Sequence, residues 1–199
     1  MISSKNFNTR KLVLLAILTA IVIVLQVVAI VTRPLFPMFS ITLVLVPIVI
    51  GAALIGIYAG AWLGLVFGFA VLISGDAAPF LAIDPVGTIT VVLLKGLLAG
   101  LTAGIVYKLI EKRNRTAAAI SAAVICPIVN SGIFIIGSYI FFLPTLTEWG
   151  ASIGYTNVTA YIFLVLVGLN LIVELAINLA LSPAIVRLIQ YRRDSKVEV

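Results

Sequence analysis

Long apolar runs, separated by short polar or proline-containing segments, occupy most of the chain. A bilayer core is crossed by about 20 apolar residues in a helix with a rise of about 1.5 Å per residue. The runs predict an all-α protein with six transmembrane helices, at about residues 12–31, 41–55, 56–74, 86–110, 117–143 and 158–189. The second run contains Pro47, so we expect a short or kinked helix there, joined to the third by a tight turn near Gly51 to Gly56.

Composition supports this membrane class. The chain has 199 residues, of which 63% are apolar and only 10% charged, against about 25% charged in an average soluble domain. Such a balance excludes a water-soluble globular enzyme and a disordered chain. We therefore expect one transmembrane domain over residues 1–199, with no separate soluble domain.

Missing residue types narrow the chemistry further. The chain has no histidine, which excludes His–Cys zinc sites and Ser–His–Asp triads. It has no phosphate-binding loop of the kind that hydrolyses ATP. We accordingly predict a protein that is not an enzyme and that holds no metal and no cofactor.

Basic residues are distributed very unevenly between the two sides of the predicted bundle. Six crossings place both termini on one side, which then carries eleven of the thirteen basic residues: Lys5, Arg10, Lys11, Lys108, Lys112, Arg113, Arg115, Arg187, Arg192, Arg193 and Lys196. Arg33 falls on the other side, and Lys95 falls inside the membrane. The positive-inside rule then predicts that both termini are cytoplasmic. The net charge of +6 is explained by basic helix ends that contact anionic lipid headgroups, rather than by binding of nucleic acid.

A set of polar residues lies inside the predicted membrane segments. Lys95 is about nine residues into the fourth helix from the outer side, where insertion costs roughly 2.5–3.5 kcal/mol. Asn170, Glu174 and Asn178 share one face of the sixth helix, and Asn130 lies on the fifth. Two interpretations are open: a structural Lys95–Glu174 ion pair, or an outward pocket in which Lys95 and Asn170 face a polar ligand. Both hold if a ligand replaces part of the pair.

Small residues form regular patterns on three helices. Glycines recur every four residues, at 56, 60, 64 and 68 on the third helix and at 96, 100 and 104 on the fourth. The pattern favours close helix packing, with a pocket or sliding surface as the alternative. Ala16 and Ala20 form an A-x-x-x-A face on the first helix, which serves either internal packing or docking of a partner membrane subunit.

The predicted outer face consists of three loops, 33–40, 75–86 and 144–157, with acidic and aromatic residues. The aromatic residues at this face are Phe36, Phe39, Phe80, Trp149 and Tyr155. They form either an interfacial aromatic belt or a lid over a planar or amphipathic ligand. Asp76 and Asp84 lie in the middle loop.

The whole pattern resembles the substrate-binding S components of energy-coupling factor (ECF) vitamin transporters. The resemblance rests on the size of the chain, on six helices with both chain termini in the cytoplasm, and on the short second helix. It also rests on Ala16 and Ala20, the stretch from Phe39 to Ala52 and the segment Ser74-Gly75-Asp76. It implies a multi-pass protein of the cell (plasma) membrane. It also implies capture of a vitamin outside the cell and delivery inward with a transmembrane T component and two ATPase subunits.

Residue roles follow partly from this resemblance. It implies gate positions in the outer loops, including Phe36, Phe39, Asp76 and Asp84, and partner docking at Ala16 and Ala20. The substrate-binding residues are our own inference from the sequence: Lys95, Asn130, Trp149, Tyr155, Asn170 and Glu174.

Substrate and mechanism leave alternatives open. Lys95, alone or together with Arg33, suits a carboxylate, and the amides of Asn130 and Asn170 suit hydroxyl or amide groups, so pantothenate is the first candidate. A heterocyclic vitamin stacked on Trp149 or Tyr155 is nearly as suitable. The alternative function is a small ion-coupled secondary transporter or channel that uses Lys95 and Glu174. A lipid-modifying enzyme using Asp76 and Asp84 lacks an accompanying base or nucleophile motif.

Overall fold

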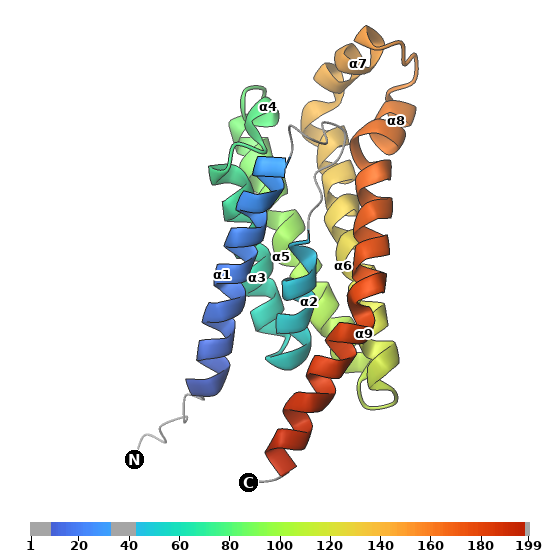
Figure 1. Ribbon diagram of the computed structural model, residues 1–199. Coiled ribbons are helices and arrows are strands. Elements are labelled where there is room, and N and C mark those ends of the chain that lie inside the picture. The colour runs from blue at the N-terminus through green and yellow to red at the C-terminus, as the bar shows by residue number, and fades with distance from the viewer. Residues whose placement is uncertain (1–8, 33–42, 198–199) are drawn as a thin grey trace, which may run out of the picture.

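The computed structural model describes residues 9–32 and 43–197, and it describes side chains within 9–31 and 43–187. Figure 1 shows an elongated bundle of roughly parallel and antiparallel helices. The elements are α1 (Thr9–Thr32), α2 (Leu45–Leu54), α3 (Ile57–Ile73), α4 (Ala78–Leu81), α5 (Pro85–Ile110), α6 (Arg115–Gly137), the π-helical η1 (Ser138–Phe142), α7 (Leu143–Ser152), α8 (Val158–Tyr161), the π-helical η2 (Ile162–Gly168) and α9 (Leu169–Val197). The described ranges contain no strand, so the all-α prediction is confirmed.

Helix lengths match a membrane protein. Four helical stretches are long and apolar enough to cross a bilayer: 9–31, 85–110, 115–152 and 158–187. The apolar helices α2 and α3 are shorter, with 10 and 17 residues. At about 1.5 Å per residue, α2 is only about 15 Å long, half the thickness of a bilayer core. The expected short second helix is therefore present, whereas a total of six membrane crossings stays a prediction.

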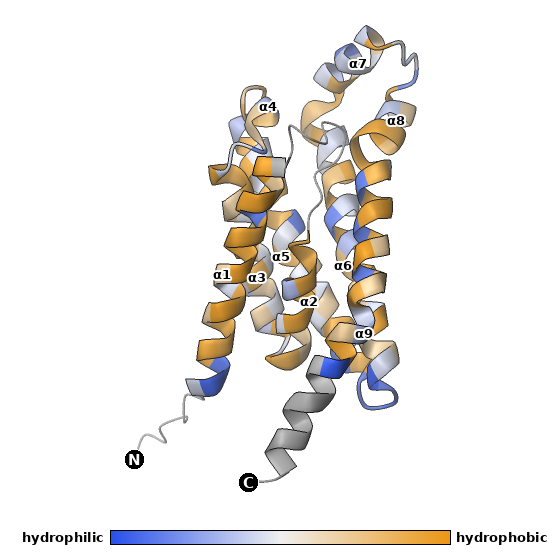
Figure 2. Ribbon diagram, viewed as in Figure 1, coloured by the Kyte–Doolittle hydropathy of each residue, from blue (hydrophilic) through white to orange (hydrophobic). Residues whose placement is uncertain are grey.

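Apolar residues occupy most of the length of the long helices (Figure 2). Large apolar side chains are exposed on every long helix, among them Val31, Ile73, Leu109, Ile140 and Ile172. Such extensive apolar surface is unfavourable in water and suits contact with lipid chains. Hydrophilic segments lie mainly at the ends of the bundle, as expected for parts that reach the headgroup regions.

The start of α1, the turn between α5 and α6, and the end of α9 lie at the same end of the bundle (Figure 1). This end carries the described basic side chains outside the interior: Arg10, Lys11, Lys108, Lys112, Arg113, Arg115 and Arg187. The charge asymmetry on which the sequence prediction rested is therefore present in three dimensions. The cytoplasmic orientation of this end stays a prediction.

The glycine ladders form a seam between α3 and α5, which run antiparallel. A Cβ atom added to Gly60 would lie 2.5 Å from the carbonyl oxygen of Gly100, and one added to Gly64 would overlap the carbonyl oxygen of Gly96. The contact is therefore backbone against backbone, which only glycine allows. It supports the packing interpretation of the ladders.

The prediction of a polar loop between the fifth and sixth helices is wrong. Residues 144–157 were expected to form a polar loop, but α7 covers Leu143–Ser152. Pro144 lies in the first turn of α7, where a helix needs no backbone donor from it. Leu146 and Gly150, four residues apart, are buried on one face. This face packs the helix onto the bundle, so the loop connecting to α8 shortens to residues 153–157.

Candidate functional site

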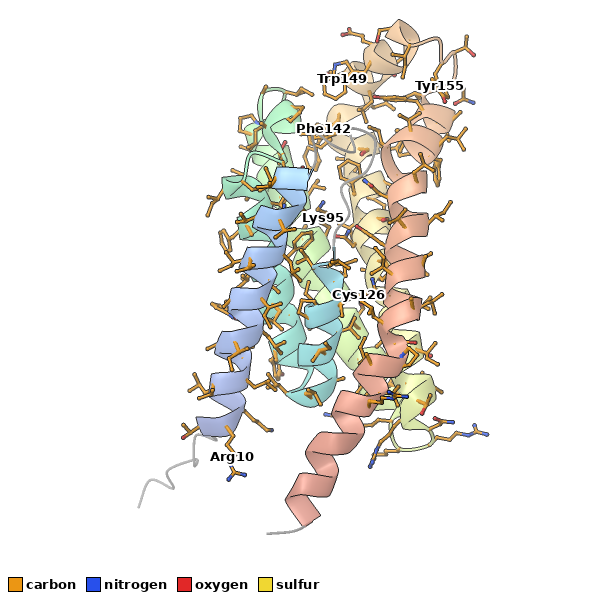
Figure 3. All side chains as sticks on the ribbon, viewed as in Figure 1. Arg10, Lys95, Cys126, Phe142, Trp149 and Tyr155 are labelled. Carbon is orange, nitrogen blue, oxygen red and sulfur yellow. The ribbon has the colours of Figure 1, made fainter. Side chains whose placement is uncertain are left out.

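Lys95 lies in the interior, about midway along the bundle (Figure 3). Its ammonium group lies 5.4 Å from the ring centroid of Phe134 on α6 and 5.9 Å from that of Phe67 on α3. The charges of Asp76 and Glu174 act on it as well. Aromatic faces and opposite charges both lower the cost of holding an ammonium at low dielectric. These neighbours offset part of the cost of placing the Lys95 ammonium among the helices.

The polar residues predicted on the sixth helix lie in the interior on α9. Asn178 is fully buried and Glu174 is 6% exposed. The Asn178 Nδ2 atom donates a hydrogen bond of 2.8 Å to the backbone carbonyl of Glu174. The Asn170 Oδ1 atom is buried and has no hydrogen-bond partner within the described part of the chain. The i, i+4, i+8 spacing therefore places all three inward.

Asn130 completes this set from α6, where it is 6% exposed. Its Oδ1 atom also lacks a hydrogen-bond partner among the described residues. Buried amide oxygens without donors are costly in a folded protein. Asn130 and Asn170 thus offer acceptors from two neighbouring helices, which suits a ligand carrying hydroxyl or amide N–H groups.

Trp149 and Tyr155 lie elsewhere. They are found toward the end of the bundle formed by α7 and α8 (Figure 3). The Trp149 ring contacts Phe80 at a centroid distance of 5.8 Å, and the Tyr155 ring contacts Tyr161 at 5.9 Å. Both rings pack against the apolar cluster around Phe142. Their described contacts are therefore with this cluster rather than with the polar residues around Lys95.

Phe80, on α4, connects this cluster to Lys95. Its ring contacts Phe134 at 5.5 Å and Phe142 at 5.0 Å in addition to Trp149. Because Phe134 also faces the Lys95 ammonium, the 75–84 segment is linked to the polar interior through one shared ring. Phe80 was expected only as an aromatic residue of the outer face, and Phe134 was not predicted. The four-residue step from Asn130 to Phe134, which places both on one helix face, was the available signal.

The predicted gate residues have different outcomes. Phe36 and Phe39 lie outside the described residues. Asp76 is half-buried, and its charge acts on Lys95. Asp84 caps α5, because its Oδ1 atom accepts a hydrogen bond of 2.9 Å from the backbone N–H of Gly87. A gating role for these residues stays a prediction.

Ala16 and Ala20 are exposed on the outer face of α1. Leu18 and Val22 are buried on its other face. Beside the two alanines, the Trp62 Nε1 atom on α3 donates a hydrogen bond of 3.2 Å to Thr19 Oγ1. The small-residue face is therefore accessible to a partner, as docking requires, and does not pack internally.

A cavity of about 370 Å³ opens at the end of the bundle that carries the start of α1. It lies between the α2–α3 turn and the last turn of α5, and its lining includes Tyr58, Tyr107, Lys108 and Glu111. None of the predicted binding residues lines this cavity.

An apolar bundle with a half-buried lysine and buried amide groups among its helices defines a multi-pass membrane protein with polar residues in its interior. The family model described as "ECF transporter, substrate-specific component" matches residues 10–186, and the chain belongs to this family. The chain is therefore a transport subunit of the plasma membrane. No curated protein and no solved structure matches the chain.

Proposed function

We propose that the chain captures a water-soluble vitamin or vitamin precursor outside the cell, with pantothenate as the first candidate. It then delivers the ligand inward in complex with a transmembrane T component and two ATPase subunits. The observation that carries this proposal is the Lys95 ammonium, which lies 5.4 Å and 5.9 Å from two aromatic ring centroids in a bundle that also holds buried amide oxygens without hydrogen-bond partners among the described residues.

Each group has a defined role in binding. Lys95 pairs with the ligand carboxylate, and the low dielectric of the interior strengthens this pairing. Asn130 and Asn170 accept hydrogen bonds from ligand hydroxyl or amide groups and so gain the donors that they lack. Glu174 and Asp76 orient the ammonium through their charges. Phe67 and Phe134 exclude water around it.

A carboxylate-bearing chain such as pantothenate fits these groups better than a ligand stacked on Trp149 or Tyr155. The rings of Trp149 and Tyr155 already pack against Phe80 and Tyr161. In the proposed complex they belong to the outer cover of the site. The 75–84 segment forms the gate, with Phe80 resting on Phe134.

Delivery depends on the outer face of α1. Exposed alanines let a partner helix approach closely, so Ala16 and Ala20 are suited to contact the T component. The basic end of the bundle faces the cytoplasm under the positive-inside rule. The ligand then enters from the end where α4 and α7 lie.

The test is a titration of the purified chain with pantothenate, comparing the native protein with Lys95→Met. A charge-assisted hydrogen bond contributes about 1.5–3 kcal/mol, so we expect an affinity loss on the order of 10- to 100-fold. Lys108→Met is the matched control, because Lys108 is exposed near the end of the same helix, and it should leave affinity unchanged.

Two results would contradict the proposal. Unchanged affinity in Lys95→Met places the ligand elsewhere. Uptake into liposomes that contain this chain alone, driven by an ion gradient without ATP, identifies a secondary transporter in which Lys95 and Glu174 couple the ion.

A further inference from the structure

Gln26 is an isolated polar residue on the inner face of α1. This face is otherwise apolar, with Leu18, Val22 and Ala29 buried along it, and Gln26 itself is only 1% exposed. Its Nε2 atom reaches Ser74 Oγ at 3.5 Å, the limit of a hydrogen bond. Its Oε1 atom has no hydrogen-bond partner within the described ranges. The side chain is therefore buried with little internal compensation.

The hydroxyl of Ser74 cannot improve this pairing. It already donates a hydrogen bond of 3.0 Å to the carbonyl oxygen of Val71. Ser74 can therefore only accept, and it accepts the long bond from Gln26 Nε2. The Gln26 carbonyl oxygen still needs a donor from another source.

Packing register gives the level of Gln26 along the bundle relative to Lys95. Ala52 of α2 packs against Gly60 of α3, and these helices are antiparallel, so α2 begins at the level of Phe67. Ser74 lies two turns further along α3 and therefore beyond the start of α2. It is followed two residues later by Asp76, whose charge acts on Lys95. Gln26 thus lies on the outer side of Lys95, toward the proposed entrance.

We propose that Gln26 is a ligand-binding residue, which accepts a hydrogen bond from a hydroxyl or amide N–H of the bound molecule. The donor group lies at the opposite end of the ligand from the carboxylate that pairs with Lys95. This inference rests on the proposed function and extends it to a residue of α1. A buried carbonyl oxygen without a donor destabilises the empty protein, and a donor supplied by the ligand removes that cost.

This assignment defines the ligand class more closely. The ligand carries an anionic group at one end and at least one hydrogen-bond donor at the other, with further donors between them for Asn130 and Asn170. Pantothenate has this order of groups: a carboxylate, an amide N–H and two hydroxyls.

The binding test uses the purified full chain, with pantothenate and its analogue lacking both hydroxyl groups as probes. Gln26→Met keeps the length of the side chain and removes the amide. We expect it to weaken pantothenate about fivefold to tenfold and to change affinity for the dideoxy analogue by less than twofold. Leu25→Met, at a half-buried neighbouring position, is the matched control and should bind both probes as the native chain does.

A second measurement does not depend on the identity of the ligand. Thermal unfolding of the ligand-free protein should give an unchanged or higher Tm for Gln26→Met, because the substitution removes a buried carbonyl oxygen that lacks a donor, at the loss of one long hydrogen bond. A structural glutamine would instead lower the Tm. The proposal is overturned by a lowered Tm, or by unchanged pantothenate affinity in Gln26→Met when the native chain binds pantothenate. If the native chain does not bind pantothenate, the substrate in the proposed function is wrong, and the Tm alone decides the role of Gln26.

Discussion

Replacing Gly64 by alanine tests the backbone seam between α3 and α5. The new Cβ atom would overlap the carbonyl oxygen of Gly96, and the equivalent atom on Gly60 would lie 2.5 Å from that of Gly100, whereas ordinary contacts begin at 3.4 Å. Neither neighbour is a flexible side chain, so the two helices must separate. Overpacking of this kind costs typically 1–3 kcal/mol, and we expect the upper end, about 3 kcal/mol, because both partners are main chain.

Thermal unfolding of the purified protein in detergent measures this cost. For a chain of this length, about 3 kcal/mol corresponds to a Tm lower by roughly 6–12 °C. Gly132→Ala is the matched control, because a Cβ atom at Gly132 on α6 meets nothing within 4 Å. That change should leave stability unchanged or raise it by about 0.5–1 kcal/mol, since alanine favours a helix more than glycine.

The comparison of the two variants can refute the packing argument. Equal Tm values for Gly64→Ala and Gly132→Ala would show that α3 and α5 are not in backbone contact. A Gly64→Ala protein that kept its Tm and its ligand affinity but lost transport would instead favour a sliding surface between the two helices.

Further predictions concern docking, helix capping and orientation. Ala16→Leu combined with Ala20→Leu should keep ligand affinity and abolish ATP-dependent transport in reconstituted complexes, because both side chains face outward; equal loss of binding would contradict this. Asp84→Ala should cost about 1 kcal/mol of stability in unfolding measurements, because the α5 cap is lost, and Asp84→Asn should restore most of it. Ser195→Cys should resist an impermeant thiol reagent in intact cells and react after permeabilisation, whereas the native Cys126 is buried; labelling in intact cells would reverse the proposed topology.

Much of the fold could be predicted from the sequence, because the length of an apolar run and the position of a proline determine locally where a helix begins and ends. The expected third helix, 56–74, is one residue longer at each end than α3. The expected fourth helix, 86–110, begins one residue later than α5 and ends at the same residue. The 144–157 loop was mispredicted because α7 depends on packing of Leu146 and Gly150 against distant residues. No local signal in a polar, proline-containing segment reports that contact.

The candidate site was predictable only in part, for the same physical reason. The four-residue spacing of Asn170, Glu174 and Asn178 correctly predicted that they share the inward face, because all three belong to one helix. The rings around Lys95 come from α3 and α6, and the relative register of separate helices is not encoded in local spacing. Gln26 was overlooked because one uncharged polar residue in an apolar helix is common, and its missing partner is visible only in the packed bundle.

The short length of α2 has an electrostatic consequence. Ile48 packs against Gly100 of α5, and α2 and α5 run in the same direction, so the N-cap residue Val44 comes level with Gly96, the neighbour of Lys95. Val44 offers no side-chain hydrogen bond to the first turn, and a helix N-terminus carries a partial positive charge of about half an elementary charge. A helix of full membrane length would bring that end to the surface. Because α2 begins about halfway along the bundle, its peptide dipoles place a partial positive charge at the level of Lys95 and favour an anion there.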